Sequence, residues 1–194
     1  MKKVLCIISL LSCLILPASC LTTLQPLITD KNVITEDRIL GNWEYDKGAI
    51  QIKRLTEETY SISFERNGIE YDMKGALTRI QEDLFIEIAP SLITDPQRPE
   101  GSGYEYNFSY LPTFTIAKLV IKNNQSLDLQ FLNGDYIKEQ INDGNMRIKH
   151  EKDGLFGSFV VTASSSELGQ FFEKYRSDDR LFSPKNSITL IRKG

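Results

Sequence analysis

Few side chains of this chain could perform acid–base, nucleophilic or metal chemistry. The 194 residues include a single histidine, His150, and the three cysteines all lie within the first twenty residues, at positions 6, 13 and 20. Serine and cysteine triads need a histidine close to the nucleophile, and histidine metal sites need further ligands around the first. His150 shares its parity with Met146 and Ile148, which indicates a buried face. The sequence therefore predicts no catalytic triad, no metal site and no cofactor.

Carboxylates are the remaining groups that could act as an acid and a base. Four pairs of neighbouring acids occur: Glu44 with Asp46, Glu57 with Glu58, Glu82 with Asp83, and Asp178 with Asp179. Most of these pairs fall in predicted turns, where acids are solvated, and a glycosidase pair has no diagnostic spacing in the sequence. Residues 142–145 are too short for a calcium loop and are interpreted as a turn. A carboxylate-based enzyme is therefore the third hypothesis, behind two non-enzymatic ones.

The first twenty residues have the parts of a secretory signal. Lys2 and Lys3 precede an apolar run from residue 4 to residue 16, and Pro17-Ala18-Ser19 leads into Cys20. The run is short for a membrane-spanning helix. A cut before Cys20 leaves the mature chain with one cysteine, at its first position, and so without a disulfide framework.

This arrangement resembles the start of a bacterial lipoprotein, in which the cysteine is acylated and becomes the mature N-terminus. The resemblance implies that Cys20 is the lipid attachment site and that the protein is anchored to a membrane of the bacterial envelope, at the outer membrane or the periplasmic face. Several acyl chains make such an attachment effectively permanent. Two alternatives stay open: lipidation at Cys13, after Leu10-Leu11-Ser12, or ordinary cleavage after Cys20.

Composition and charge limit the function of the part that follows. Removal of residues 1–19 takes away Lys2 and Lys3 and changes the formal charge from −3 to −5. A mildly acidic chain argues against nucleic acid as a partner. About 175 residues are enough for one domain with its own core. We expect a signal peptide at 1–19, a polar tether with Pro26 at 20–38, and one domain at 39–194.

The domain shows the two-residue period of strands that have one buried face. Turn sequences such as Asp46-Lys47-Gly48, Asn67-Gly68 and Gln81-Glu82-Asp83 separate these strands. Since one face stays polar, the sheet is expected to be antiparallel, and short strands at regular spacing indicate a barrel or a sandwich. The predicted strands include Ile50–Ile52, Tyr60–Phe64, Ile69–Met73 and residues 84–88, 104–111, 114–122, 126–132, 146–150, 158–162 and 187–192.

Two helices interrupt the strands. Ser164 and Glu167 have the spacing of a capping box, and Leu168, Phe171, Phe172 and Tyr175 then form one apolar stripe. A second, short helix is expected from residue 135 to residue 141.

Gly41-Asn42-Trp43, at the start of the first strand, resembles the lipocalins and related small barrels, whose first strand carries a glycine, any residue and a tryptophan. In that group an arginine from a late strand covers the tryptophan at the closed end of the barrel. The resemblance implies that Trp43 and Arg192 form this structural pair, and that the fold is a lipocalin-like antiparallel β-barrel with one or two short peripheral helices. The overall layout resembles a lipocalin-like group of bacterial envelope lipoproteins.

Four aromatic residues at strict two-residue spacing form one face of a predicted strand: Tyr104, Tyr106, Phe108 and Tyr110. If that face lies inside a barrel, it offers apolar rings and hydroxyl donors to a small ligand. The alternative is ordinary core packing.

Two non-enzymatic functions follow from these patterns. The leading hypothesis is a membrane-anchored lipoprotein that binds an apolar or amphipathic small ligand inside its barrel. The alternative is a structural or protein-interaction lipoprotein whose barrel is filled with side chains and whose surface contacts another envelope protein.

Overall fold

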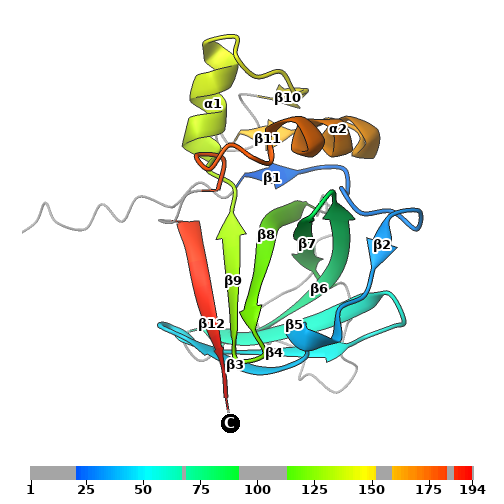
Figure 1. Cartoon of the computed structure of the whole chain (residues 1–194), viewed down its shortest axis with the longest axis vertical. Coiled ribbons are helices and arrows are strands. Elements are labelled where there is room, and N and C mark those ends of the chain that lie inside the picture. Colours follow the sequence, from blue (N-terminus) through cyan, green and yellow to red (C-terminus); the bar gives the residue numbers. More distant parts are fainter. Residues whose placement is uncertain (1–20, 67–68, 92–112, 152–158, 183–185, 194) are drawn as a thin grey trace, which may run out of the picture.

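The computed structural model describes residues 21–66, 69–91, 113–151, 159–182 and 186–193 (Figure 1). Helices and strands follow the order β1 (Thr22–Thr23), β2 (Val33–Ile34), a 3-10 turn (Asp37–Ile39), β3 (Gly41–Tyr45), β4 (Gly48–Arg54), β5 (Thr59–Arg66), β6 (Ile69–Ile80), β7 (Asp83–Pro90), β8 (Phe114–Asn123), β9 (Ser126–Phe131), α1 (Gly134–Asn142), β10 (His150–Glu151), β11 (Val160–Val161), α2 (Ser165–Tyr175) and β12 (Ser187–Arg192).

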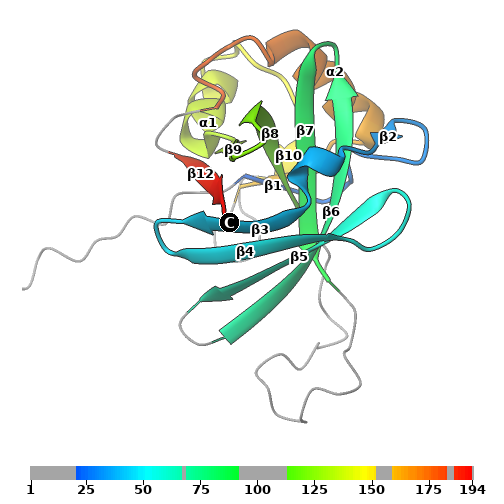
Figure 2. The same cartoon turned by 60° about the horizontal axis from the view of Figure 1, so that its bottom comes forward.

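Eight of these strands form a closed antiparallel barrel. Strands β3 to β9 pair in chain order, and β12 lies between β9 and β3. The pairing of β8 with β9 completes the ring. Figure 2 shows β12 beside β3, although the two strands lie at opposite ends of the domain in the sequence. The predicted antiparallel barrel with two short helices is confirmed.

The position of β12 differs from that of the last barrel strand in a lipocalin. The resemblance places a single helix after eight consecutive strands, whereas here both helices precede the strand that closes the ring. The chain leaves the barrel after β9, builds α1, β10, β11 and α2, and then returns to pair β12 with β9 and β3. Barrel closure therefore joins the first and last strands of the barrel.

Alternation along the strands divides the apolar side chains between two cores. Inward-facing residues fill the barrel, among them Trp43, Tyr60, Leu77 and Leu127, each with no exposed area. Tyr60 is polar only at its hydroxyl, which accepts a hydrogen bond of 2.7 Å from the Glu36 N–H. Burying aromatic and aliphatic side chains in this way is the main favourable term in folding.

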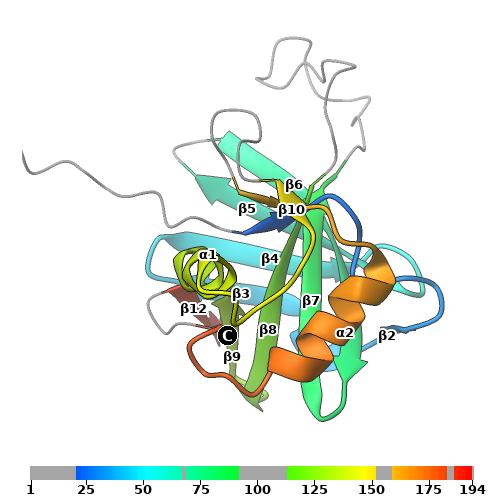
Figure 3. The same cartoon turned by 90° about the horizontal axis from the view of Figure 1, so that it is seen from above.

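The second core lies on the outer face of the barrel. Phe85 of β7 points outward and lies 5.2 Å, between ring centroids, from Phe172 of α2. The apolar stripe of α2 therefore packs on the barrel wall. The helices, β1, β10, β11 and residues 143–149 together cover this face, and we call them the cap (Figure 3).

Both predicted helices are present. Ser164 and Glu167 form the complete capping box, with the Ser164 N–H 2.8 Å from a Glu167 carboxylate oxygen. The shorter helix, α1, has Asn133 as its N-cap. In the described part of the chain, no helix combines the length and the apolar character that crossing a membrane requires.

The predicted tether at residues 20–38 is wrong for residues 21–38. Strand β1 pairs with β8 and β11, and β2 pairs with β6. Leu21 and Leu27 are 5% and 1% exposed. The outer face of the barrel needs an apolar cover, and the apolar residues of this segment supply it despite the polar residues between them. Leu21 and Leu27 are therefore part of the folded body.

The predictions of full strands at residues 146–150 and 158–162 are also wrong. Among the described residues of these two segments, the strands are His150–Glu151 and Val160–Val161, and they extend β1 into a small sheet of the cap. Residues 146–149 alternate between buried and exposed because Met146 and Ile148 pack on the cap core, not because they pair in the barrel. The hairpin predicted at Asn67-Gly68 and the strand at 104–111 lie outside the described residues.

Replacement of the helix cap gives a first test of the cap structure. We expect Ser164→Ala to lower the free energy of unfolding by about 1 kcal/mol, because α2 loses a side-chain acceptor for its N-terminal N–H groups. Urea unfolding followed by circular dichroism measures this change. Ser166→Ala, at an exposed position of the same helical turn, is the control, and an equal loss in both variants would contradict a specific capping role.

Candidate functional site

The contact that the lipocalin resemblance implied is present at one end of the barrel. The guanidinium carbon of Arg192 lies 4.3 Å from the centroid of the Trp43 ring. Trp43 is fully buried, and its indole N–H donates a 2.8 Å hydrogen bond to the carbonyl of Ile39. A cation over the face of an indole is attracted by the ring quadrupole.

Arg192 also binds three backbone carbonyls from two distant parts of the chain. Its nitrogens donate to the carbonyls of Arg38, Leu40 and Asn124 at 2.8, 2.8 and 2.7 Å. The planar guanidinium can direct donors to several acceptors at once, which an ammonium group cannot do in the same geometry. The residue therefore ties β12 to the 3-10 turn before β3 and to the β8–β9 turn.

The backbone conformation at Gly41 and the closeness of Arg192 both favour glycine at this position of the motif. Its φ is +133°, and a Cβ at this position would lie 2.5 Å from Nη1 of Arg192. A side chain here would meet both a strained backbone and the arginine. The sequence Gly-Asn-Trp thus serves the packing of Arg192.

The other predicted site residues lie outside the described residues. This applies to Cys20, the expected lipid attachment site, and to the aromatic wall of Tyr104, Tyr106, Phe108 and Tyr110. Their roles stay predictions.

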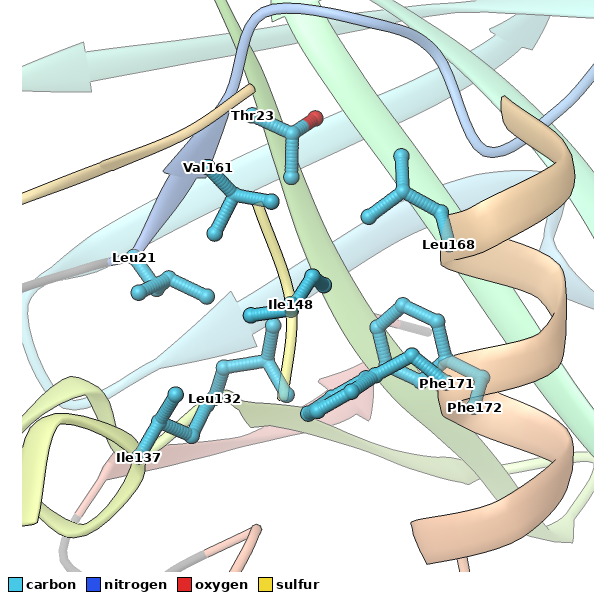
Figure 4. Close-up of a pocket in the computed structure, with 9 residues that line it drawn as sticks. All are labelled: Leu21, Thr23, Leu132, Ile137, Ile148, Val161, Leu168, Phe171 and Phe172. Carbon is cyan, nitrogen blue, oxygen red and sulfur yellow. The ribbon is translucent and has the colours of Figure 1, made fainter. Parts of the chain in front are cut away.

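Buried apolar side chains line the described part of the barrel interior, and two pockets lie in the cap. One is an internal void of about 10 Å³ between β1 and α2 (Figure 4). Such a void is about large enough for one water molecule, and Thr23 is the only polar residue in its lining, so it is not a ligand site.

The second pocket is an open groove of about 790 Å³ on the surface of the cap. One wall is α2, and the other is the segment 144–150, which leads from the turn after α1 to β10 (Figure 3). Apolar side chains form its floor, and Met146 and Phe171 are 3% and 5% exposed. Ile148 and Phe171 line both this groove and the internal void. We call this feature the cap groove.

Two contacts join the walls of the cap groove near its ends. Lys149 forms a 2.9 Å ion pair with Glu167, at the start of α2, and the Tyr175 hydroxyl donates a 3.2 Å hydrogen bond to the Asn145 carbonyl. The Lys149 ammonium and the Ser164 N–H and hydroxyl lower the pKa of Glu167 to about 2. The carboxylate is therefore held in its ionised form.

Cations predominate on the rim of the cap groove. Arg147, Lys149 and Lys174 are exposed there, and Glu167 is the one acid that lines it. Among the described residues, Lys149 pairs with that acid, whereas Arg147 and Lys174 form no ion pair. His150 stacks on Phe159 with 4.8 Å between ring centroids, and its Nδ1 lies 2.8 Å from the Ile148 carbonyl. The histidine is thus half-buried at the edge of the groove.

The acidic pairs noted in the sequence do not converge on a cleft. Glu82 and Asp83 both contact Arg176, which lowers the pKa of Glu82, and Asp178 contacts Arg180, which lowers its pKa to about 2. Glu44 forms a 3.1 Å ion pair with Lys193 on the surface. Within the described residues, no group of three or more metal-ligating side chains is placed to hold an ion.

A buried carboxylate that the sequence analysis missed is Glu87, whose pKa is raised and not lowered. It is 6% exposed, on the outer face of β7, and accepts hydrogen bonds from the N–H groups of Leu27 and Ile28. Burial raises its pKa to about 7, against the opposing effect of these two donors. Its place within the apolar run Leu84–Ile88 was the available sequence signal.

Comparisons with known proteins gave no relatives for this chain. No family model matches it, and neither a curated protein nor a solved structure matches.

The contacts of Arg192 can be tested by a substitution that keeps the charge. We expect Arg192→Lys to lower the free energy of unfolding by about 1–3 kcal/mol, because an ammonium leaves backbone carbonyls without donors. Urea unfolding measures this, with Lys193→Ala as the control because its ion pair is exposed. A loss below that of the control would contradict the role of the guanidinium.

Glu87 should make stability depend on pH. The folded state binds its proton more tightly than the unfolded chain, so the free energy of unfolding should fall as the pH rises from about 4.5 to about 7. The upper limit is about 3 kcal/mol. Glu87→Gln should flatten this dependence, because an amide has no proton to lose in this range.

Urea midpoints at pH 5 and at pH 7.5 measure this effect in the parent protein and in Glu87→Gln. Glu58→Gln, at an exposed position, should keep the parent's dependence. An unchanged dependence in Glu87→Gln would show that other groups cause it.

Proposed function

We propose that this chain is a lipid-anchored protein of the bacterial envelope that binds its ligand or partner on the surface of a packed barrel. The observation that carries the proposal is the filled interior of the described barrel, together with a surface groove of about 790 Å³ on the cap. Trp43, Tyr60 and Leu127, which point into the barrel, have no exposed area. The barrel then serves as a rigid scaffold for the cap.

The anchor part of the proposal rests on the leader and on the burial of Leu21. Cys20 follows a signal-like segment, and Leu21, the next residue, is 5% exposed in the cap core. Consecutive Cα atoms lie about 3.8 Å apart. A lipid on Cys20 would therefore attach directly to the folded body, without a flexible linker between them.

The lipocalin-like resemblance supports a second candidate function, in which a small apolar ligand lies inside the barrel. The contact of Arg192 with Trp43 is the observation in its favour, since it matches the arrangement implied for that group. The aromatic face of Tyr104, Tyr106, Phe108 and Tyr110 would be the ligand-binding wall. The packing of the described interior favours surface binding over this alternative.

Lipid labelling in a bacterial host tests the anchor. We expect the protein to incorporate an alkyne-tagged fatty acid and to sediment with membranes, and we expect Cys20→Ser to lose both properties because it lacks the acylated sulfur. Cys13→Ser is the matched control and should behave as the parent. Loss of label in Cys13→Ser, with label kept in Cys20→Ser, would move the anchor to the earlier cysteine.

Native mass spectrometry of the purified lipoprotein tests the position of the ligand. Surface binding predicts that replacing Tyr106 and Tyr110 together by Ala removes no bound small molecule. A co-purified apolar species that is lost in this double variant would establish the barrel-carrier function instead.

A further inference from the structure

The two walls of the cap groove have similar lengths and run in opposite directions. Along α2, the lining runs from Glu167 to Tyr175, which spans about 12 Å at 1.5 Å per helical residue. Along the other wall, Asn145 to Lys149 spans at most about 13 Å, the length of an extended chain. Because Lys149 contacts Glu167 and Tyr175 contacts Asn145, the two walls run antiparallel and match in length.

The floor of the cap groove is apolar and preformed. Ile141, Met146, Ile148, Phe171 and Tyr175 supply it. The Phe171 and Tyr175 rings lie 5.0 Å apart, between centroids, and the Tyr175 hydroxyl is bound to the facing wall. A volume of about 790 Å³ lies in the range of small-molecule sites. The floor thus suits an apolar chain lying parallel to α2.

The charged residues on the rim of the cap groove favour a ligand with a negative charge. Arg147 projects from the segment 144–150 and Lys174 from the helix, so cations stand on both sides of the groove. The single lining acid, Glu167, already binds Lys149 and the Ser164 cap. An anionic head group could therefore contact Arg147 and Lys174 without meeting a free carboxylate, and arginine binds carboxylates with two parallel hydrogen bonds.

We propose that the cap groove binds a fatty-acid-like ligand, with its acyl chain on the floor of Phe171, Tyr175 and Met146 and its carboxylate between Arg147 and Lys174. This inference rests on the proposed function in one respect, namely that binding occurs outside the barrel. It holds whether or not Cys20 carries a lipid. The groove favours an anion over neutral and cationic amphiphiles, because Arg147 and Lys174 have no ion-pair partner among the described residues and the only contact of the Lys174 ammonium there is the face of the Tyr175 ring, 4.8 Å from its centroid.

Photo-crosslinking in membrane vesicles that contain the full-length protein tests this proposal. The probe is a palmitic acid analogue with a diazirine in its chain, and its methyl ester is the neutral comparison. We expect the acid to label peptides from residues 141–150 and 165–175, and we expect at least tenfold less labelling by the ester.

Charge reversal on the rim supplies the second arm of the test. Arg147→Glu with Lys174→Glu should reduce labelling by the acid at least tenfold, and both residues are exposed, so the fold should persist. Lys47→Glu with Lys53→Glu is the matched control, since it makes the same change in charge at exposed positions before and within β4, away from the cap. Thermal unfolding of both variants checks that the fold is kept.

The possible outcomes separate this proposal from the proposed function. Equal labelling by acid and ester, or equal loss in the two double variants, would overturn the fatty-acid site while leaving surface binding by another partner intact. If the cap groove binds an acidic peptide and not the fatty acid, the ligand is a protein and the fatty-acid proposal is wrong. Labelling on residues 104–110 would overturn both proposals, because it would place the ligand at the predicted aromatic wall.

Discussion

Strand β12 closes the barrel, and both the barrel core and the cap form around this closure. Strand β12 must return from the cap to lie between β9 and β3, and its pairing joins segments more than 140 residues apart in the chain. Such a long-range contact has a large loop-closure cost. Interactions of Arg192 offset part of this cost. Its guanidinium lies over the Trp43 ring and donates hydrogen bonds to three backbone carbonyls. Gly41 leaves the space that the guanidinium occupies.

A barrel closed in this way and filled with side chains leaves its outer surface as the place for recognition. The eight strands bury aromatic and aliphatic residues inside, and the outward face of β7 provides a second apolar surface that the cap covers. Residues 21–34 and α2 meet over this face, with Glu87 holding the N-terminal segment through two backbone N–H groups. A buried carboxylate without a cation is unusual, and the two donors explain why it is tolerated there.

The cap groove arises from packing and not from a recognisable motif. A segment of five residues reaches nearly the length of two turns of helix, so the two can lie side by side and be joined at both ends. Met146 and Ile148 alternate with Arg147 and Lys149. The apolar side chains therefore lie on the floor of the cap groove and the cations on its rim. The same period that suggested a barrel strand therefore produces one wall of a groove.

Features that depend on neighbouring residues could be predicted from the sequence: the alternation of β4 to β6, the capping box at Ser164, the apolar stripe of α2 and the Gly-Asn-Trp motif. Each is a local pattern whose period or spacing matches one backbone geometry. Arg192 was paired with Trp43 through a family resemblance and not through a local pattern, since the two residues are far apart in the chain. The elements that cover the outer face of the barrel became clear from the tertiary structure alone. Leu21 and Leu27 look like parts of a tether until β7 and β8 offer them an apolar surface, and Glu87 and Leu27 meet across 60 residues of chain. Arg147 and Lys174 likewise become one rim only when α2 lies beside residues 144–150, because no local pattern encodes that contact.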